Sequence, residues 1–441
     1  MRLSSAVCGS LLLLVPLGLA AQEFPVNTSK VGLQVCPAVV ANPEGGYLVL
    51  FGSITSGLPG GRPGVLAQRF GLSGERIGAE FALNTEDPSC LAAVPSGPGR
   101  LLVAWGIRGE IIGRQTVYAR HFDYQGNALS PRFQAGEGTA YAAPAAACDA
   151  DGRCWVAWIT QGVDSVRARR FSVTGQPLGD EIRLDAPSPP GSRERWDLEL
   201  SADPQGGFVA SWWSGNTETG PPEEPTPPPN GQVRLQRVSA TGELLGEIGL
   251  GTEPATFAYS DGAVCHPAGG GFFAAVSRVR IDLAGPDAIL LRRFDASGSP
   301  VGLERFVAEA AQPRPSLENL HLVCGPDGML LLWTEYKASG RILFGRFFNL
   351  SGDPSGAPFL ISESGGRASA TLLGSGHFLA AWEEYQLDAD GYDIVGRVYR
   401  AAANPLSLHG GRFKVEATFR EPHTGALGQA EPRPLTDDTG T

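Results

Sequence analysis

The chain has 441 residues with 59 Gly and 35 Pro, and no segment longer than 14 residues lacks both of these residues. This composition excludes a fold built on long helices and favours β structure. The formal net charge of -11, without any block of Lys or Arg, excludes a surface that tracks a nucleic-acid backbone. After the N-terminus no apolar run reaches the ~18 residues that span a membrane, so we expect a water-soluble mature protein.

The first 21 residues have the layout of a secretory signal peptide. Arg2 precedes an apolar run rich in Leu, and the small residues Ala20 and Ala21 follow that run. Cys8 precedes the apolar run, which is the wrong side for a lipid-modified cysteine. We therefore expect residues 1–21 to be removed and the mature protein to be secreted or periplasmic.

Residues 22–404 repeat with a period near 50 residues. Each unit contains an apolar run that ends in a large residue, at Phe51, Trp105, Trp158, Trp212, Val276, Trp333 and Trp382. This is the period of a four-stranded propeller blade. Within each unit we expect four strands, a to d, with a turn rich in Pro, Asp and Gly between strands a and b. Examples are strand b at residues 155–158 and strand c at residues 166–171 of the third unit, and strand d at residues 80–84 of the first unit. The predicted fold class is all-β, a seven-bladed β-propeller of four-stranded blades.

The two ends of the repeat complement each other. Residues 23–28 read Glu-Phe-Pro-Val-Asn-Thr and match the strand d text of residues 80–85, Glu-Phe-Ala-Leu-Asn-Thr. The seventh unit has no clear strand d after its strand c, residues 394–399. We therefore expect Phe24 and Val26 to pair beside that strand, so that the N-terminal strand becomes the outer strand of the last blade and closes the ring.

This repeat resembles that of secreted bacterial β-propellers built from ~50-residue units with Gly-Phe-Val-Ala-Trp and Arg-Arg-Phe-Asp types of strand. The strands at 155–158 and 290–294 carry the resemblance, which covers residues 22–404. It implies the fold and a secreted bacterial protein, but no activity, because the function of this family is not defined. The large excess of Arg over Lys is typical of a GC-rich bacterial genome.

Residues 405–441 depart from the blade pattern. Residues 410–418 read as a new strand, and residues 435–440 read as the turn that follows it. The segment is similar to the opening of a small C-terminal β module of secreted bacterial proteins. We expect it to be the start of such a module, incomplete at Thr441.

Six cysteines follow the signal peptide, and an even number in an exported protein predicts disulfides. Cys148 and Cys154 flank the a–b turn of the third unit, whereas Cys36 with Cys90 and Cys265 with Cys324 occupy equivalent positions in neighbouring units. The first pair flanks a hairpin turn, whereas the other two pairs would join neighbouring blades. A bridge between blades requires Cα atoms about 4.4 to 6.8 Å apart, and buried free thiols are the alternative.

No residue constellation predicts a reaction, so the sequence supplies no catalytic residue and no cofactor-binding residue. One candidate metal site is the acidic loop of the last unit, where Asp388, Asp390 and Asp393 alternate with other residues around a glycine. Carboxylates in this arrangement can bind calcium, a cation that takes six to eight oxygen ligands. The alternative is a solvated loop between strands b and c.

The loops between strands b and c are enlarged, above all the Pro-rich residues 221–229. In a propeller they share one face with the d–a connections, and that face is the predicted binding surface. We expect a non-enzymatic binding or scaffold protein that takes a protein or glycan partner. The alternative is a polysaccharide-active hydrolase or lyase. Two or more carboxylates with perturbed pKa, gathered at the mouth of the central channel, would favour the enzyme.

Overall fold

The computed structural model describes residues 23–28, 31–55, 58–109, 111, 113–139, 142–160, 165–186, 194–204, 206–215, 231–250, 257–280, 286–310, 316–337, 340–373, 377–385 and 392–400. All of them belong to one unit of the chain, Met1–Leu408. The predicted signal peptide, the segment 405–441 and the Pro-rich loop lie outside the described residues, so the predictions for them stay predictions. Within the described part, no helix is long and apolar enough to cross a membrane.

Twenty-eight strands form seven sheets of four. Blade 1 contains β2 (Leu33–Ala41), β3 (Tyr47–Ile54), β4 (Gly64–Phe70) and β5 (Arg76–Ala82). Blade 2 contains β6 (Pro88–Pro95), β7 (Arg100–Arg108), β8 (Arg114–Asp123) and β9 (Phe133–Thr139). Blade 3 contains β10 (Ala145–Cys148), β11 (Cys154–Ile159), β12 (Val166–Phe171) and β13 (Ile182–Arg183). Blade 4 contains β14 (Glu194–Ala202), β15 (Phe208–Gly215), β16 (Gln232–Val238) and β17 (Leu244–Leu250).

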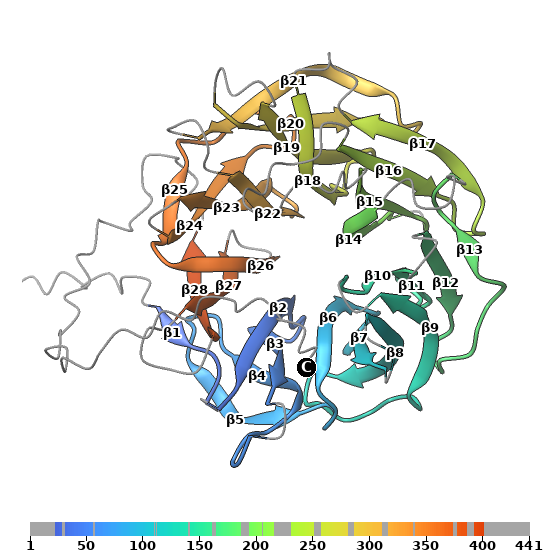
Figure 1. The fold of residues 1–441 in the computed structure, drawn as a ribbon, viewed down its shortest axis with the longest axis vertical. Helices are drawn as coiled ribbons and strands as arrows, with labels where there is room; N and C mark the ends of the chain where they lie inside the picture. Colours follow the sequence, from blue (N-terminus) through green and yellow to red (C-terminus); the bar gives the residue numbers. More distant parts are fainter. Residues whose placement is uncertain are drawn as a thin grey trace, which may run out of the picture. The chain divides into compact units, whose positions relative to one another are not determined.

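Blade 5 contains β18 (Phe257–Cys265), β19 (Phe272–Arg280), β20 (Ala288–Phe294) and β21 (Pro300–Glu309). Blade 6 contains β22 (Ser316–Cys324), β23 (Met329–Lys337), β24 (Gly340–Phe348) and β25 (Phe359–Ser362). Blade 7 contains β26 (Gly365–Leu373), β27 (His377–Tyr385), β28 (Tyr392–Arg400) and, as its outer strand, β1 (Phe24–Pro25). Neighbouring strands within each blade are antiparallel. The seven sheets surround a common axis with strand a of each blade innermost (Figure 1). The predicted seven-bladed propeller is confirmed.

The large residue that ends strand b explains why the sheets pack face to face. Trp105, Trp158, Trp212 and Trp382 are fully buried. Each lies in a hydrophobic cluster with residues of the preceding blade, as Trp158 does with Leu102 and Val117 of blade 2. Burial of a large aromatic side chain is among the strongest apolar contributions to stability. In blades 2, 3, 4 and 7 this tryptophan therefore joins the blade to the one before it.

The ring closes as the two chain ends predict. Phe24 pairs with Gly396 and Pro25 with Val395, and the Val26 amide donates to the carbonyl oxygen of Ile394 at 2.7 Å. Asn27 continues the closure with its side chain, since its Oδ1 accepts from the Ile394 amide at 2.8 Å. The N-terminal strand thus supplies the outer edge of blade 7, which removes an unpaired sheet edge.

The structure forms three disulfides, in the pairs that the repeat suggests. Cys148 and Cys154 lie directly opposite each other across the β10–β11 hairpin. Cys36–Cys90 joins blades 1 and 2 with a Cα separation of 5.6 Å, and Cys265–Cys324 joins blades 5 and 6 at 5.5 Å. Neighbouring inner strands are therefore close enough for a bridge between blades.

Candidate functional site

The inner strands carry a bulge near their middle in six blades. The register shifts occur in β2, β6, β14, β18, β22 and β26. A bulge bends its strand and re-aims a side chain. Three bulge residues that are not glycine have positive φ: Cys36 at 54°, Asp197 at 54° and Asn319 at 53°. This conformation is unfavourable for L-residues, and its repetition around the axis marks these positions as candidates for function.

Charged side chains gather at these bulges in blades 4 to 7. Asp197 and Glu199 lie on β14, Asp261 on β18, Glu318 on β22 and Arg367 on β26. Asp197 interacts electrostatically with Glu199 of its own blade, with Glu318 and with Arg367. Blades 4 and 7 stand three places apart around the ring, so side chains that interact between them must converge toward the axis. We call Asp197, Glu199, Asp261, Glu318 and Arg367 the axial cluster.

Asp197 is the member of the axial cluster that is exposed to water. The protein that surrounds it on the axis still removes part of its hydration. Desolvation raises the pKa of Asp197, the Arg367 guanidinium lowers it, and the charges of Glu318 and Glu199 raise it, so that the pKa is about 6. Asp197 is therefore an accessible carboxyl group that is half protonated near pH 6.

Asp261 lies behind Asp197 and is only 5% exposed. Its Oδ1 accepts from the Gly262 amide at 2.7 Å, and its Oδ2 accepts from the Leu320 amide of blade 6 at 2.8 Å. Burial, followed by the charge of Asp197, raises the pKa of Asp261 well above its usual range. Because both oxygens are engaged by backbone amides, Asp261 fixes the position of the neighbouring inner strands.

Blades 1, 6 and 7 add polar groups around Arg367. The Cys36 amide donates to Oε1 of Glu383 at 2.8 Å, and burial raises the pKa of Glu383 while Arg367 and Arg341 lower it. Nη1 of Arg367 lies 3.5 Å from the sulfur of Cys90. The Cys36–Cys90 disulfide therefore contacts the guanidinium of Arg367.

A tyrosine from blade 6 reaches the same region. Asn319 donates from Nδ2 to the hydroxyl of Tyr336 at 2.8 Å. Burial raises the pKa of Tyr336 above its usual value, so the phenol keeps its proton at neutral pH. Tyr336 is thus a neutral hydrogen-bonding group near the axial cluster.

Two tyrosines lie at the b–c end of blade 7. Tyr385 ends β27 and Tyr392 begins β28, and the two residues pair directly across the hairpin. Their ring centroids are 5.6 Å apart in an edge-to-face arrangement, and Tyr385 is 52% exposed. The guanidinium of Arg341 lies 5.4 Å from the Tyr336 ring and 5.2 Å from the Tyr392 ring. This face is the one that the enlarged b–c loops predicted as the binding surface.

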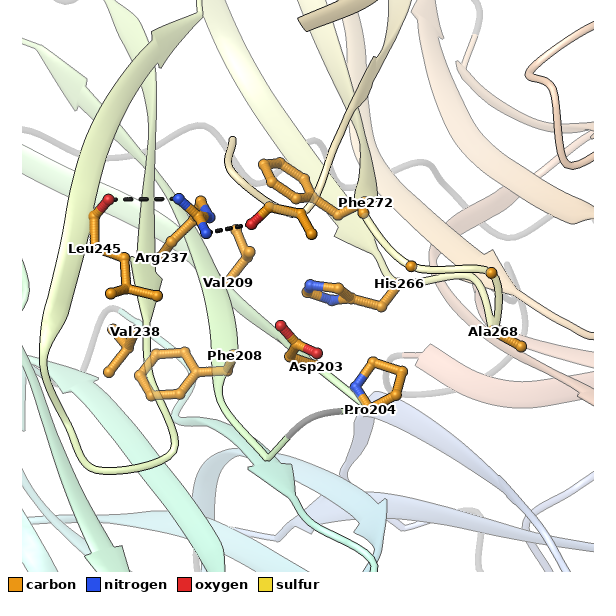
Figure 2. A pocket seen from close by; sticks show the side chains of 14 residues that line it. Asp203, Pro204, Phe208, Val209, Arg237, Val238, Leu245, His266, Ala268 and Phe272 are labelled. Atoms are coloured by element: carbon orange, nitrogen blue, oxygen red, sulfur yellow. Dashed lines mark hydrogen bonds between the residues drawn. The ribbon is translucent and has the colours of Figure 1, made fainter. Parts of the chain in front are cut away.

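A separate pocket of about 240 Å³ lies between blades 4 and 5, at the far ends of their inner strands (Figure 2). Asp203, Arg237 and His266 supply its polar lining. Nδ1 of His266 lies 3.0 Å from the hydroxyl of Ser201, and desolvation lowers the pKa of His266 to about 4. Arg237 donates to the carbonyl oxygens of turn residues, among them Ser297 at 2.5 Å. Contacts within the protein therefore occupy the main polar groups of this pocket.

The predicted calcium loop is described only in part. Asp388 and Asp390 lie outside the described residues, whereas Asp393 is 2% exposed and its Oδ1 accepts from Asn27 at 2.7 Å. Asp393 thus contributes to ring closure. Nowhere in the described part do three His, Cys, Asp or Glu side chains form a group that could hold a metal ion. Calcium binding by the loop stays a prediction.

No member of the axial cluster is among the site residues predicted from the sequence. The available signal was the appearance of acids inside apolar inner strands, as in the Trp-Asp-Leu-Glu text of residues 196–199. Residues that all units of the repeat share maintain the fold. The cluster residues are those that differ from one unit to the next, and only the ring brings them together.

No protein-family model matches the chain, and no curated protein has a significantly similar sequence. Solved structures do match. A polysaccharide lyase, Uly1, has 8% identity and a TM-score of 0.52, with 85% of this chain and 91% of the lyase covered. A protein of unknown function from Dyadobacter fermentans has 10% identity and a TM-score of 0.51, with 86% and 98% covered. The endosialidase of phage phi92 has 10% identity and a TM-score of 0.50, with 96% and 76% covered. At such low identity these similarities show the propeller fold alone.

Proposed function

We propose that the protein is a polysaccharide-active enzyme, a glycoside hydrolase, that uses the axial cluster as its active site. The observation that carries this proposal is the convergence of carboxylates from blades 4, 5 and 6, including an exposed Asp197 with a pKa near 6. A binding protein of the kind that the sequence favours does not need such an arrangement, because like charges held together cost stability. The order of the two functions weighed from the sequence is therefore reversed.

Hydrolysis of a glycosidic bond needs two carboxyl groups with different protonation. Asp197 is the general acid that gives a proton to the leaving oxygen, because it is exposed and its pKa is raised. Glu318 is the second carboxylate, which activates water or attacks the anomeric carbon. Arg367 compensates part of the negative charge, and Asp261 is a positioning residue that orders β18 and β22.

A lyase is supported less well by the same residues. Elimination from an acidic sugar requires a base for the proton next to the carboxylate and a group that neutralises this carboxylate. Tyr336 keeps its proton, because burial raises its pKa. The carboxylates of the axial cluster would also repel an acidic sugar. Hydrolysis is therefore the better proposal, and the two reactions give different products.

The proposal is tested by incubating the purified protein with arabinan, xylan, polygalacturonate and polysialic acid. We expect new reducing ends from at least one of them, without the ultraviolet absorbance of the unsaturated sugars that a lyase produces. Glu318→Gln, which keeps the shape of the side chain, should lower kcat at least about 100-fold. Absence of cleavage from all four polysaccharides, or full activity of Glu318→Gln, would overturn the proposal. Ultraviolet absorbance of the products would indicate the lyase.

We also propose that the protein is secreted, as the signal-peptide text of residues 1–21 predicts. Three disulfides support this proposal, because disulfides persist in oxidising compartments and are rare in the bacterial cytosol. Expression of the full chain in a bacterial host tests it. We expect the mature protein outside the cytoplasm with an N-terminus at residue 21 or 22, whereas an uncleaved cytoplasmic protein would contradict it.

A further inference from the structure

Tyr385 is an exposed aromatic residue at the b–c end of blade 7, where contacts within the protein hold the neighbouring side chains. It is 52% exposed, although it lies within a paired strand and not in a loop. Its backbone pairs with Tyr392, and the edge of one ring faces the other at 5.6 Å. The guanidinium of Arg341 from blade 6 lies 5.2 Å from the centroid of the Tyr392 ring. Tyr392 therefore contacts both Arg341 and Tyr385, and the ring of Tyr385 remains open to solvent.

Tyr385 also lies beside the axial cluster. Successive side chains of a strand point to opposite faces, so Tyr385 and Glu383 share one face of β27, about 7 Å apart along the strand. Glu383 interacts with Arg367 and Arg341 and accepts a hydrogen bond from the Cys36 amide. A ligand that reaches from the axis toward blade 7 along this face would meet the ring of Tyr385.

The charges along this path favour a ligand without charge. Five acidic side chains lie in or beside the axial cluster, against the two guanidinium groups of Arg341 and Arg367: Asp197, Glu199, Asp261, Glu318 and Glu383. An acidic sugar would be repelled, whereas the apolar face of an uncharged pyranose or furanose ring packs well on an aromatic side chain. The tyrosine ring adds contact area and brings no charge of its own.

We infer that Tyr385, supported by Tyr392 and Arg341, is a stacking subsite for an uncharged sugar unit of the polysaccharide. This inference rests on the proposed function and adds the class of substrate and the residue that holds it. The subsite lies at the b–c end of blade 7, next to the axial cluster. It orients the chain and takes no part in bond cleavage.

The test separates binding from catalysis. Tyr385→Ala should raise KM for the cleaved polysaccharide about 3- to 10-fold with kcat nearly unchanged, because ring stacking contributes about 0.5 to 1.5 kcal/mol. Tyr385→Phe, which retains the ring, should restore the KM. Phe306→Ala is the matched control, since Phe306 is 56% exposed on the outer strand of blade 5, away from the axis. We expect this variant to have the KM of the unmodified protein.

A second measurement keeps this inference separate from the proposed function. Affinity electrophoresis in gels with arabinan, xylan, polygalacturonate or polysialic acid measures binding without turnover. We expect arabinan or xylan to retard the Asp197→Asn variant, the added Tyr385→Ala substitution to weaken that retardation about 3- to 10-fold in affinity, and the two acidic polysaccharides to have no effect. Retardation by an acidic polysaccharide, retardation that Tyr385→Ala leaves unchanged, or no retardation by any of the four would overturn the subsite. If the protein binds the polysaccharide through Tyr385 but does not cleave it, the proposed function fails and the retardation that depends on Tyr385 remains.

Discussion

Blades 1 to 3 and blades 4 to 7 use the same strand framework for different purposes. In blades 1 and 2 the inner bulges hold the Cys36–Cys90 disulfide, and in blade 3 the inner strand is a run of three alanines and a cysteine. In blades 4 to 7 the equivalent strands carry acids and Arg367. The outer strands and the tryptophans between blades do not distinguish the two halves. Function therefore depends on substitutions in one strand of a repeat whose other strands maintain the fold.

The disulfides between blades and the axial carboxylates should have opposite effects on stability. A disulfide between neighbouring inner strands restricts the unfolded chain and so favours the folded ring. A group of carboxylates on the axis has the opposite effect, since desolvation and mutual repulsion raise the pKa of Asp197 and of Asp261. We therefore expect Cys36–Cys90 of blades 1 and 2 and Cys265–Cys324 of blades 5 and 6 to offset part of the cost of holding the carboxylates on the axis.

The largest expected effect is on catalysis, and it compares the axial cluster with the pocket between blades 4 and 5. Asp197→Asn should lower kcat about 100- to 10,000-fold, the usual contribution of a general acid. Asp203→Asn makes the same chemical change in the other site and should leave kcat unchanged, because Asp203 lies at the far end of β14. Steady-state kinetics on the cleaved polysaccharide measures both. Equal losses in the two variants would remove the distinction between the sites.

The next effect is on stability and concerns the two disulfides of blades 1 to 3. Loss of Cys36–Cys90, which closes a loop with a sequence separation of 54, should cost about 4 kcal/mol. Loss of Cys148–Cys154, with a separation of 6, should cost roughly 2 kcal/mol. Denaturant unfolding of the two double Cys→Ala variants measures these values. A larger loss for the short hairpin bridge would contradict the view that the bridge between blades is the stronger support.

The sequence predicted the fold better than the site for a physical reason. Propeller closure requires the same strands in every blade, so Trp105, Trp158 and Trp212 repeat at visible intervals, and the match of residues 23–28 to 80–85 indicated the closing strand. Residues of the axial cluster come from four blades, about 60 residues apart along the chain. Neither Asp197 nor Arg367 is surrounded by a local motif, and only the bulges and the ring bring the two together.

The smallest expected effect is the pH dependence of stability, which should have opposite signs at the two sites. The pKa of Asp197 is raised in the fold, so its contribution is present at low pH and is lost as pH rises through about 6. The pKa of His266 is lowered to about 4, so its contribution is present above 6.5 and is lost as pH falls toward 4. Asp197→Asn should therefore reduce the loss of stability that occurs as pH rises through about 6. His266→Gln should reduce the loss of stability that occurs as pH falls toward 4. Thermal unfolding between pH 4 and pH 8 measures both slopes, and slopes of the same sign would show that one assignment is wrong.

The most direct test of the account is the ionisation of Asp197 itself, measured by carboxyl-carbon NMR titration of the whole protein and assigned with Asp197→Asn. We predict a midpoint near pH 6, and a lower midpoint in Glu318→Gln because one neighbouring negative charge is removed. This measurement needs no substrate. A midpoint near 3.8, the ordinary value for an aspartate, with no response to Glu318→Gln, would contradict the claim that the four blades build an acid site on the axis.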